Sequence, residues 1–478
     1  MTNFENYIEH LKKIPNLNVE KMLKCFEKEK KSGVRFNIKK IDKDEKIAEN
    51  LQKNLKKYAL NCVFLPILWC NTGFYYNNAE RLGKNILHEL GLYYLQEPSA
   101  MAPVEFLDIE KENIVLDLCA SPGGKSTQIA QKLVDGFLIA NEIVPTRAKT
   151  LCENIQRLGI SNTIVLNHSP KELEKRFENY FDRILIDAPC SGEGMFRKND
   201  DAITEWTETS PISCASRQKE IVESAYKMLK SGGKMVYSTC TFSLEENEEI
   251  IKSLLDNHND LEITPINHEK YNFDYGIDID ETKRLKNCAR LYPYNIDGEG
   301  HFFAVIHKKN IKNKIENIKN KDAYIDTNFK KNNKKITKIS QKTQNNHQKI
   351  KIFEDFAKRY LNISFENYYN FGDYLYANCM IDLTGLKCLN AGIFLGETKK
   401  DYFIPSWHLA HCLTKNDFKE VVEVSEDEAK KYIEGLGLDT KHDDGWVLLC
   451  YKDLPLSFGK CVAGKIKNHY PKHLRKKL

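Results

Sequence analysis

Short apolar runs that alternate with helical stretches between Asn113 and His307 constrain the fold more than any other feature of this sequence. The runs read NIVLDL, FLIANE, TIVLNH, RILIDA, KMVYST and FFAVIH. Strands that alternate with helices usually join one sheet side by side and in the same direction. This region therefore predicts an α/β domain with a largely parallel sheet. In such a sheet a ligand binds outside the carboxyl ends of the strands, so the chemistry is expected where these runs end.

The remainder of the 478-residue chain divides around this domain, because so long a chain usually forms more than one core. We expect a small N-terminal α/β lobe over residues 1–105, the α/β domain over 106–308, and one or two compact units over 352–478. Residues 309–351 are dominated by Lys, Asn, Gln and Ile, which predicts a flexible basic linker. A helix of poor amphipathicity is the alternative for that segment.

Composition narrows the class of protein. Hydrophobic residues make up 41% of the chain and charged residues 29%, without a long apolar run. The N-terminal MTNFENYIEHLKK lacks the apolar segment of an export signal, which predicts a cytoplasmic protein without a membrane partner. The 14 cysteines are scattered without a CxxC spacing, so we expect reduced thiols and no metal site. A net charge of +5 is compatible with nucleic-acid binding without demanding it.

A ligand turn follows the first run, in the segment IVLDLCASPGGKSTQIA over residues 114–130. Gly123 and Gly124 carry no Cβ, so a ligand can approach the backbone where a helix begins. The turn matches neither GxGxxG nor a complete phosphate loop. This disfavours a dinucleotide or ATP and favours an adenosyl cofactor without phosphates. Glu142 ends the second run, at the spacing of an acid that binds ribose hydroxyls. A helix-start acid is its structural alternative.

Two cysteines and one acid stand where the fourth and fifth runs end. Asp187 and Cys190 lie in FDRILIDAPCSGEGMFRK, Cys240 follows KMVYST, and each thiol is flanked by Ser or Thr. A thiolate that adds to carbon 6 of cytosine makes carbon 5 nucleophilic enough to take a methyl group. An acid at N3 stabilises the adduct, and a base removes the carbon-5 proton. Cys240, Asp187 and Cys190 suit these roles. Buried cysteine is also common as a small apolar residue, so the residues alone leave both interpretations open.

These motifs resemble those of the Nop/Sun/Fmu RNA cytosine-5 methyltransferases, and most of all the bacterial RsmF-type enzymes that modify small-subunit ribosomal RNA. The resemblance rests on LDLCASPGGKS, the strand that ends in NE, DAPCSGEGMFRK, YSTCTFSLEENE and RLYP…GEGHFFA. It extends to GVRFN and QEPSAMAP near the N-terminus, and to LGETKKDYFIPSWHLA and GWVLLCY…GKIKNHYPKHLRK beyond the linker. It therefore covers nearly the whole chain except the linker.

The resemblance implies a Rossmann-like class I methyltransferase domain, a PUA-like RNA-binding region at the C-terminus, and S-adenosylmethionine as cofactor. It assigns the attack on the cytosine ring to Cys240, and it assigns to Cys190 a role in releasing the methylated product. The residues that it places around the cofactor are Cys119, Ala120, Ser121, Pro122, Gly123, Gly124, Lys125, Glu142, Arg147 and Asp187. The third run departs from the family pattern, because TIVLNHSP lacks the aspartate that often lies near the adenine. Ser169 is the positional substitute, and His168 is expected to be structural.

The predicted function is methylation of carbon 5 of cytosine in 16S rRNA of the small ribosomal subunit, by a monomer. The alternatives are the same chemistry on tRNA, or a catalytically silent RNA-binding assembly factor, which the two retained cysteines and the intact SPGG turn disfavour. The closing KIKNHYPKHLRKKL combines six Lys/Arg with Tyr470, which suits phosphate binding and aromatic stacking on RNA. A solvated charged tail is the alternative. Met195, Phe196 and Phe242 are candidates either for an apolar wall around a flipped cytosine or for core residues.

Overall fold

The structure is a computed structural model that describes residues 2–41, 62–77, 81–198, 200–310 and 342–478, together with residues 55, 58 and 60. Most of the predicted linker, residues 311–341, lies outside the described residues. Residues 342–351, which the prediction also assigns to the linker, belong to helix α14 (Lys342–Tyr360). Among the described helices, none is long and apolar enough to cross a membrane.

The N-terminal lobe combines two helices with a four-stranded antiparallel sheet. Helices α1 (Asn3–Lys12) and α2 (Val19–Phe26) begin at Thr2 and Asn18, whose side chains accept backbone N–H groups of the first turn. The sheet has the order β2 (Leu65–Ile67), β3 (Cys70–Tyr76), β1 (Ser32–Phe36) and β4 (Tyr93–Leu95). The described part of the lobe also contains two short helices, α4 (Ile86–Glu89) and α5 (Ala102–Glu105).

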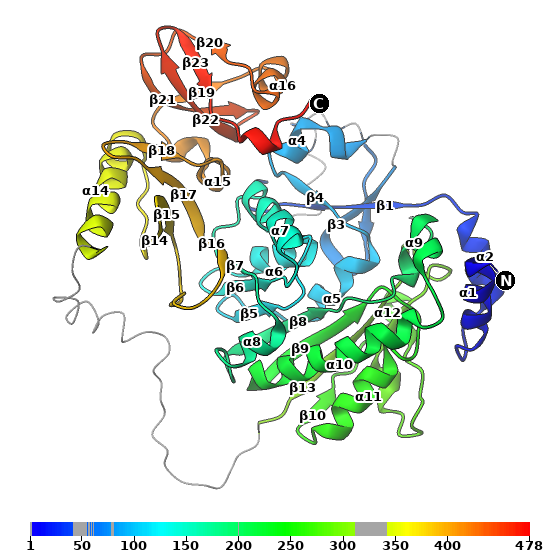
Figure 1. Cartoon of the computed structure of the whole chain (residues 1–478). Coiled ribbons are helices and arrows are strands. Elements are labelled where there is room, and N and C mark those ends of the chain that lie inside the picture. Colours follow the sequence, from blue (N-terminus) through cyan, green and yellow to red (C-terminus); the bar gives the residue numbers. More distant parts are fainter. Residues whose placement is uncertain are drawn as a thin grey trace, which may run out of the picture.

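The central sheet confirms the predicted Rossmann-like α/β fold (Figure 1). Its parallel strands have the order β7 (Thr163–Leu166), β6 (Phe137–Asn141), β5 (Ile114–Asp117), β8 (Phe181–Asp187) and β9 (Leu229–Thr239). Antiparallel strands follow on the β9 side: β13 (His301–Lys308), β12 (Ala289–Leu291), β11 (Asp274–Tyr275) and β10 (Leu261–Ile263), which pairs with β13. Because Val115, Ile139 and Leu185 are fully buried, the strands read as apolar runs rather than as alternating patterns.

Helices cover the central sheet and connect its parallel strands. They are α6 (Gly124–Lys132), α7 (Pro145–Arg157), α8 (Pro170–Glu174), α9 (Asp200–Glu205), α10 (Ser210–Met228), α11 (Glu248–Asn257) and α12 (His268–Tyr271). The connections bring the carboxyl ends of β5, β6, β8 and β9 to one edge of the sheet. That edge is where the predicted site residues belong.

Two units follow α14. The first has the sheet β14 (Tyr369–Phe371), β15 (Tyr374–Ala377), β17 (Ile393–Thr398) and β18 (Phe403–Pro405), followed by helix α15 (Trp407–Cys412). The second has the sheet β19 (Val421–Glu423), β21 (Gly445–Tyr451), β22 (Leu454–Val462), β23 (Lys465–Asn468) and β20 (Leu438–Asp439), with helix α16 (Glu426–Glu434).

One strand of the C-terminal part belongs to the catalytic sheet. Strand β16 (Cys388–Ala391) pairs antiparallel with β7 and forms the outer edge of the central sheet (Figure 1). The buried side-chain amide of Asn390 donates to the carbonyls of Thr163, at 3.2 Å, and Gly392, at 2.6 Å. The predicted boundary between residues 308 and 352 therefore separates segments of sequence that share one sheet.

Candidate active site

The cofactor turn is held rigidly between β5 and α6. Gly123 has a φ of 111°, in the left-handed region that favours glycine, and α6 begins at the next residue. Asp117, the last residue of β5, accepts a hydrogen bond from the Ser126 hydroxyl at 2.6 Å. Burial raises the pKa of Asp117 to about 7. The side-chain amide of Asn154 donates to the Pro122 carbonyl at 2.9 Å, which fixes the outer side of the turn.

Two of the predicted cofactor residues, Ser121 and Glu142, contact a third, Arg147. Its guanidinium donates to the Ser121 carbonyl at 3.0 Å and lies 3.4 Å from the Glu142 carboxylate, while the Ser121 hydroxyl donates to the Arg147 carbonyl at 2.9 Å. Glu142 is buried at the end of β6 and also accepts from the backbone N–H of Val144 at 2.9 Å. Ala120 is buried and Cys119 half-buried in the same turn. The strand-end acid therefore lies beside the glycine turn, as a ribose-binding acid must.

The loop after β7 has structural partners. Ser169 is the N-cap of α8, and its hydroxyl donates to the Glu172 carboxylate at 2.8 Å. The side-chain amide of Asn167 donates to the carbonyls of Glu142 and Ile143 at 2.7 and 2.9 Å. The His168 ring accepts from the backbone N–H of Lys387 at 2.7 Å, which gives this histidine the structural contact expected of it. An adenine contact from Ser169 stays a prediction.

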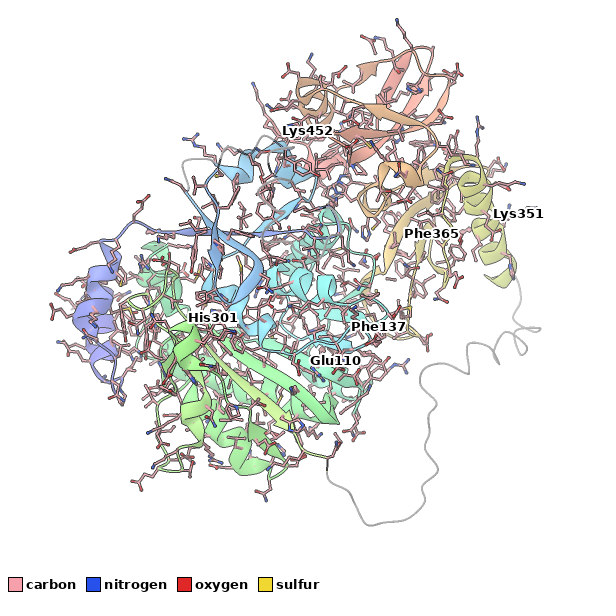
Figure 2. The ribbon with its side chains drawn as sticks, turned by 180° about the vertical axis from the view of Figure 1, so that it is seen from behind. Glu110, Phe137, His301, Lys351, Phe365 and Lys452 are labelled. Carbon is pink, nitrogen blue, oxygen red and sulfur yellow. The ribbon has the colours of Figure 1, made fainter. Side chains whose placement is uncertain are left out.

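Lys125 and Asp187 form an ion pair at the end of β8. The Lys125 Nζ lies 2.8 Å from Oδ2 of Asp187, and the family resemblance places both residues around the cofactor. Burial by itself would raise the pKa of Asp187, but the ammonium of Lys125 reverses this effect and holds that pKa well below its usual range. Asp187 is therefore a carboxylate at neutral pH. Two groups that the sequence analysis did not predict also face it: the Ser238 hydroxyl donates to Oδ1 at 2.9 Å, and Nε2 of the buried His301 lies 3.6 Å from the same oxygen. His301 is the first residue of β13 (Figure 2).

The two predicted thiols lie side by side. Sγ of Cys190, three residues beyond the end of β8, is 3.4 Å from Sγ of Cys240, the residue after β9. The backbone N–H of Gly194 donates to the Cys240 carbonyl at 2.8 Å and joins the two loops. The hydrogen bond with Cys240 and burial both raise the pKa of Cys190 well above its ordinary value. Two thiols in this arrangement can share one proton and one negative charge.

The hydroxyl residues that flank the thiols hold the two loops together. The Ser191 and Thr241 hydroxyls are 2.8 Å apart, and the Ser191 hydroxyl also donates to the carboxylate of Glu246. Glu246 is completely buried and accepts from the backbone N–H of Ser191 and from the Gln218 amide, both at 2.9 Å. Gln218 donates in addition to the Pro189 carbonyl at 3.0 Å. The Ser and Thr flanks were visible in the sequence, whereas Glu246 had no signal that distinguished it from the other acids of LEENEE.

Helix α1 packs against the same loops. His10 Nε2 lies 3.2 Å from Oε1 of the buried Glu193, whose Oε2 accepts from the backbone N–H of Phe242 at 3.0 Å. Phe196 packs edge-on against Tyr7, with ring centroids 4.9 Å apart. Phe196 and Phe242 are 1% and 3% exposed and belong to one apolar cluster with Tyr7 and Leu11 of α1, which favours the core alternative for these two residues. Met195 is half-buried.

The closing basic segment is more ordered than a solvated tail. Tyr470 is 1% exposed and packs edge-on against Trp407, so it is not available for stacking on RNA as the sequence suggests. Exposed lysines remain at positions 465, 467, 472, 476 and 477. Lys476 forms an ion pair of 2.7 Å with Glu89, which ties the chain end to the N-terminal lobe.

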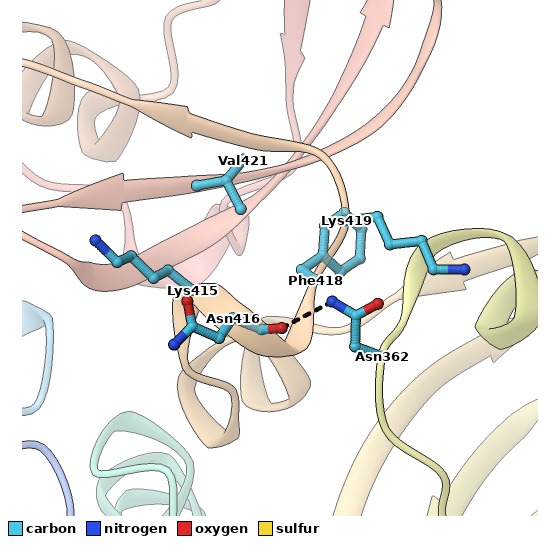
Figure 3. A pocket seen from close by; sticks show the side chains of 6 residues that line it. All are labelled: Asn362, Lys415, Asn416, Phe418, Lys419 and Val421. Atoms are coloured by element: carbon cyan, nitrogen blue, oxygen red, sulfur yellow. Dashed lines mark hydrogen bonds between the residues drawn. The ribbon is translucent and has the colours of Figure 1, made fainter.

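The hydrogen-bond acceptors around the glycine turn fit the hydroxyl-bearing adenosyl cofactor predicted from the sequence. Glu142 offers carboxylate oxygens at a strand end, and Oδ1 of the buried Asp117 has no hydrogen-bond partner among the described residues. Among all the residues that the structure describes, no group of three or more His, Cys, Asp or Glu side chains could hold a metal ion. A hollow of about 550 Å³ lies elsewhere, between the two C-terminal units, and is lined by Asn362, Lys415, Asn416, Phe418, Lys419 and Val421 (Figure 3). It contains none of the predicted site residues.

Four family models match consecutive parts of the chain. The N-terminal domain of 16S rRNA methyltransferase RsmF matches residues 4–98, and 16S rRNA methyltransferase RsmB/F matches residues 104–307. The first C-terminal domain of the RsmF rRNA methyltransferase matches residues 355–413, and the methyltransferase RsmF PUA domain matches residues 419–476. These matches confirm the resemblance stated from the sequence motifs.

Individual relatives agree with the family models. Ribosomal RNA small subunit methyltransferase F of Vibrio campbellii is 32% identical over 98% of this chain and 97% of its own length, and that of Vibrio vulnificus is 31% identical with the same coverage. A solved methyltransferase homologue from Pyrococcus horikoshii has a TM-score of 0.53 and 29% identity, and covers 63% of this chain and 93% of that chain. Members of this family are enzymes that use S-adenosylmethionine, as the sequence predicts for this chain. The chain belongs to the RsmF family of small-subunit ribosomal RNA methyltransferases.

Proposed function

We propose that this protein methylates carbon 5 of cytosine in 16S rRNA through a covalent adduct between Cys240 and the cytosine ring. The observation that carries the proposal is the 3.4 Å separation of the Cys190 and Cys240 sulfurs beyond two strand ends, where Asp187 ends one of the strands. Carbon 5 of cytosine is too weak a nucleophile to attack a methyl donor directly. Addition of the Cys240 thiolate to carbon 6 converts the ring into an enamine whose carbon 5 can attack.

The ion pair of Asp187 and Lys125 matches the polar edge of cytosine. Asp187 is ionised and therefore accepts a hydrogen bond, as the exocyclic N4 amino group requires. N3 of cytosine needs a donor, and the Lys125 ammonium, 2.8 Å from Asp187, is the charged donor beside it. This modifies the expectation from the sequence, in which Asp187 alone serves N3. Bound S-adenosylmethionine supplies the electrophilic methyl group.

Release of the product requires a base for the carbon-5 proton, and Cys190 suits this step. The main cause that raises the pKa of Cys190 is its hydrogen bond with Cys240. Once the Cys240 sulfur is bonded to carbon 6 it no longer carries the negative charge, so that cause disappears and Cys190 can lose its proton to solvent. The Cys190 thiolate then removes the carbon-5 proton, the bond from Cys240 to carbon 6 breaks, and Cys240 leaves as a thiolate.

The RNA substrate is proposed from the relatives' names and from the PUA domain match at residues 419–476. We propose that the protein acts in the cytoplasm as a monomer on ribosomal RNA or on the small subunit. The same chemistry on tRNA and a catalytically silent assembly factor remain the competing functions. Calorimetry with S-adenosylmethionine separates the silent factor from the enzyme, because a factor that has lost the activity has no need to bind the cofactor, whereas the enzyme must bind it.

The decisive assay presents the protein with naked 16S rRNA, assembled small subunits and tRNA, each with S-adenosylmethionine. Nucleosides are then identified by mass spectrometry. We expect 5-methylcytosine in the ribosomal RNA of one or both of the first two samples and none in tRNA. Methylation only of tRNA would favour the first alternative, and a methyl group on another base or ring position would contradict the proposal.

A further inference from the structure

Glu246 is a buried acid that the chemistry above does not use, although it touches the loops of both thiols. Its Oε1 accepts from the Ser191 backbone and from Gln218, and its Oε2 accepts from the Ser191 hydroxyl. Glu246 itself lies in the loop after Cys240, between β9 and α11, and its carboxylate bonds across to Ser191, the residue after Cys190. The carboxylate is linked to Thr241, the residue after Cys240, only through the Ser191 hydroxyl.

The contacts of Glu246 are those of an ionised group. Three donors converge on its two oxygens: the N–H and O–H of Ser191 and the amide N–H of Gln218. A protonated carboxyl would have to reverse the Ser191 hydroxyl to keep its hydrogen bond. The titratable groups that face Glu246 are Cys190, Cys214, Tyr237 and Glu193. The guanidinium of Arg217 lies behind Cys214, 3.3 Å from its sulfur.

We propose that Glu246 is a positioning residue that assigns different roles to the two thiols: its negative charge keeps the shared proton on Cys190 and leaves the charge on Cys240. A carboxylate disfavours a second negative charge nearby. This one bonds directly to Ser191, the neighbour of Cys190, and is linked to Thr241, the neighbour of Cys240, only through the Ser191 hydroxyl. The catalytic part of this inference rests on the proposed function. The difference in charge between the two sulfurs is independent of the proposed function, because it concerns the protein without RNA or cofactor.

The difference in charge between the Cys190 and Cys240 sulfurs should depend on pH. Burial raises the pKa of Glu246 to about 7, so the carboxylate predominates at pH 8 and the neutral acid at pH 6. Cys240 should therefore be the more reactive thiol at pH 8. Its advantage over Cys190 should shrink as the pH falls through about 7, because protonation removes the charge that separates the two sulfurs.

Glu246→Gln tests the charge with little change of shape. The glutamine oxygen can accept from the Ser191 N–H and from Gln218, and its amide can donate to the Ser191 hydroxyl. Because the native acid is harder to ionise in the fold than in the unfolded chain, the ionised form costs stability above pH 7. The variant should therefore melt no earlier than the wild type at pH 8. Glu249→Gln is the matched control, because Glu249 is exposed in the first turn of α11.

The readout is competitive alkylation by a limiting amount of iodoacetamide, without RNA or cofactor. Trypsin separates the two thiols, because Cys190 lies in residues 184–197 and Cys240 in residues 235–252, each the only cysteine of its peptide. At pH 8 we expect at least fivefold more label on Cys240 than on Cys190 in the wild type and in Glu249→Gln. In Glu246→Gln the ratio should fall toward one and lose its pH dependence, and RNA methylation should slow at least tenfold.

An unchanged labelling ratio in a folded Glu246→Gln variant would overturn the inference. So would a wild-type ratio that does not vary between pH 6 and pH 8. A wild type that shows the ratio and its pH dependence but methylates no cytosine would instead support the role of Glu246 in charge placement and contradict the proposed function.

Discussion

A single carboxylate, Asp187, is surrounded by groups that favour its charge. Lys125 bonds one oxygen, and Ser238 and His301 face the other. Burial and the nearby Lys125 lower the pKa of His301, so this imidazole is neutral and does not compete with Lys125 as the counter-ion. An ionised, oriented acceptor is what a cytosine amino group needs, and it costs no rearrangement at the moment of reaction.

Replacing Asp187 by Asn tests how much the negative charge of this side chain, as distinct from its shape, contributes to methyl transfer. The Asp187→Asn side chain keeps its size but cannot neutralise the buried Lys125, so we expect kcat/KM for methyl transfer to fall by about 10²–10³-fold. Initial rates of methyl transfer at saturating S-adenosylmethionine measure the loss. The exposed Asp135→Asn should keep the wild-type rate. A rate for Asp187→Asn within about threefold of the wild type would remove Asp187 from the chemistry.

Some site residues could be predicted from the sequence because ligands of a parallel sheet bind at the carboxyl ends of its strands. Asp187 ends an apolar run, Cys190 comes three residues after it, and Cys240 directly follows another run. The carboxyl ends of parallel strands share one edge of the sheet. His301 lies at the start of an antiparallel strand, and it reaches Asp187 only because β13 pairs with β9. Glu246 depends on the conformation of a loop. No spacing rule predicts either of these contacts, because both follow from tertiary packing.

At the scale of elements, the N-terminal lobe supports the cofactor helix. Arg35 of β1 is completely buried and donates to Gln96 at 2.9 Å, Gln131 at 2.8 Å, Thr127 at 2.6 Å and the Gly124 carbonyl at 3.1 Å. Three of these acceptors belong to α6. The GVRFN and QEPSAMAP segments are thus joined to the glycine turn by one guanidinium, whose planar fork of donors a lysine cannot reproduce.

Arg35→Lys should therefore weaken both the fold and the cofactor site. We expect a loss of about 2–4 kcal/mol in the free energy of unfolding, because buried acceptors lose their donors while a charge remains. Affinity for S-adenosylmethionine should drop as the start of α6 shifts. Urea unfolding and calorimetry measure the two effects, and Arg81→Lys on the surface is the matched control. If Arg35→Lys is as stable as Arg81→Lys, Arg35 does not support α6.

At the scale of the whole molecule, the C-terminal part is attached to the catalytic domain through β16 and α15. On α15, the His408 Nε2 lies 3.0 Å from the Ile160 carbonyl, and the His411 ring lies 2.7 Å from the Arg157 carbonyl and 3.2 Å from that of Leu456. These contacts connect both C-terminal units to the end of α7 and the loop that follows it. The sequence predicted separate units because it shows apolar patterning within a segment but not the pairing of β16 with a distant strand.

Asn390→Ala tests that attachment. The change leaves the buried carbonyls of Thr163 and Gly392 without the amide donor, which should cost about 1–3 kcal/mol. Hydrogen exchange should accelerate in β16 and β7 before it does in β5 or β8, since the edge pairing opens first. Asn416→Ala on the surface should leave the exchange of all four strands unchanged. Exchange in β16 and β7 that stays at the wild-type rate would show that Asn390 does not hold the two strands together.

The most direct test of the whole account is covalent capture on RNA that contains 5-fluorocytosine, with S-adenosylmethionine present. Fluorine at carbon 5 cannot leave as a proton, so the adduct persists and its protein partner can be mapped by mass spectrometry. The account predicts an adduct at Cys240 in the wild type, none in Cys240→Ala, and one in Cys190→Ala that also accumulates on unmodified RNA. An adduct mapped to Cys190, or capture that survives in Cys240→Ala, would contradict it.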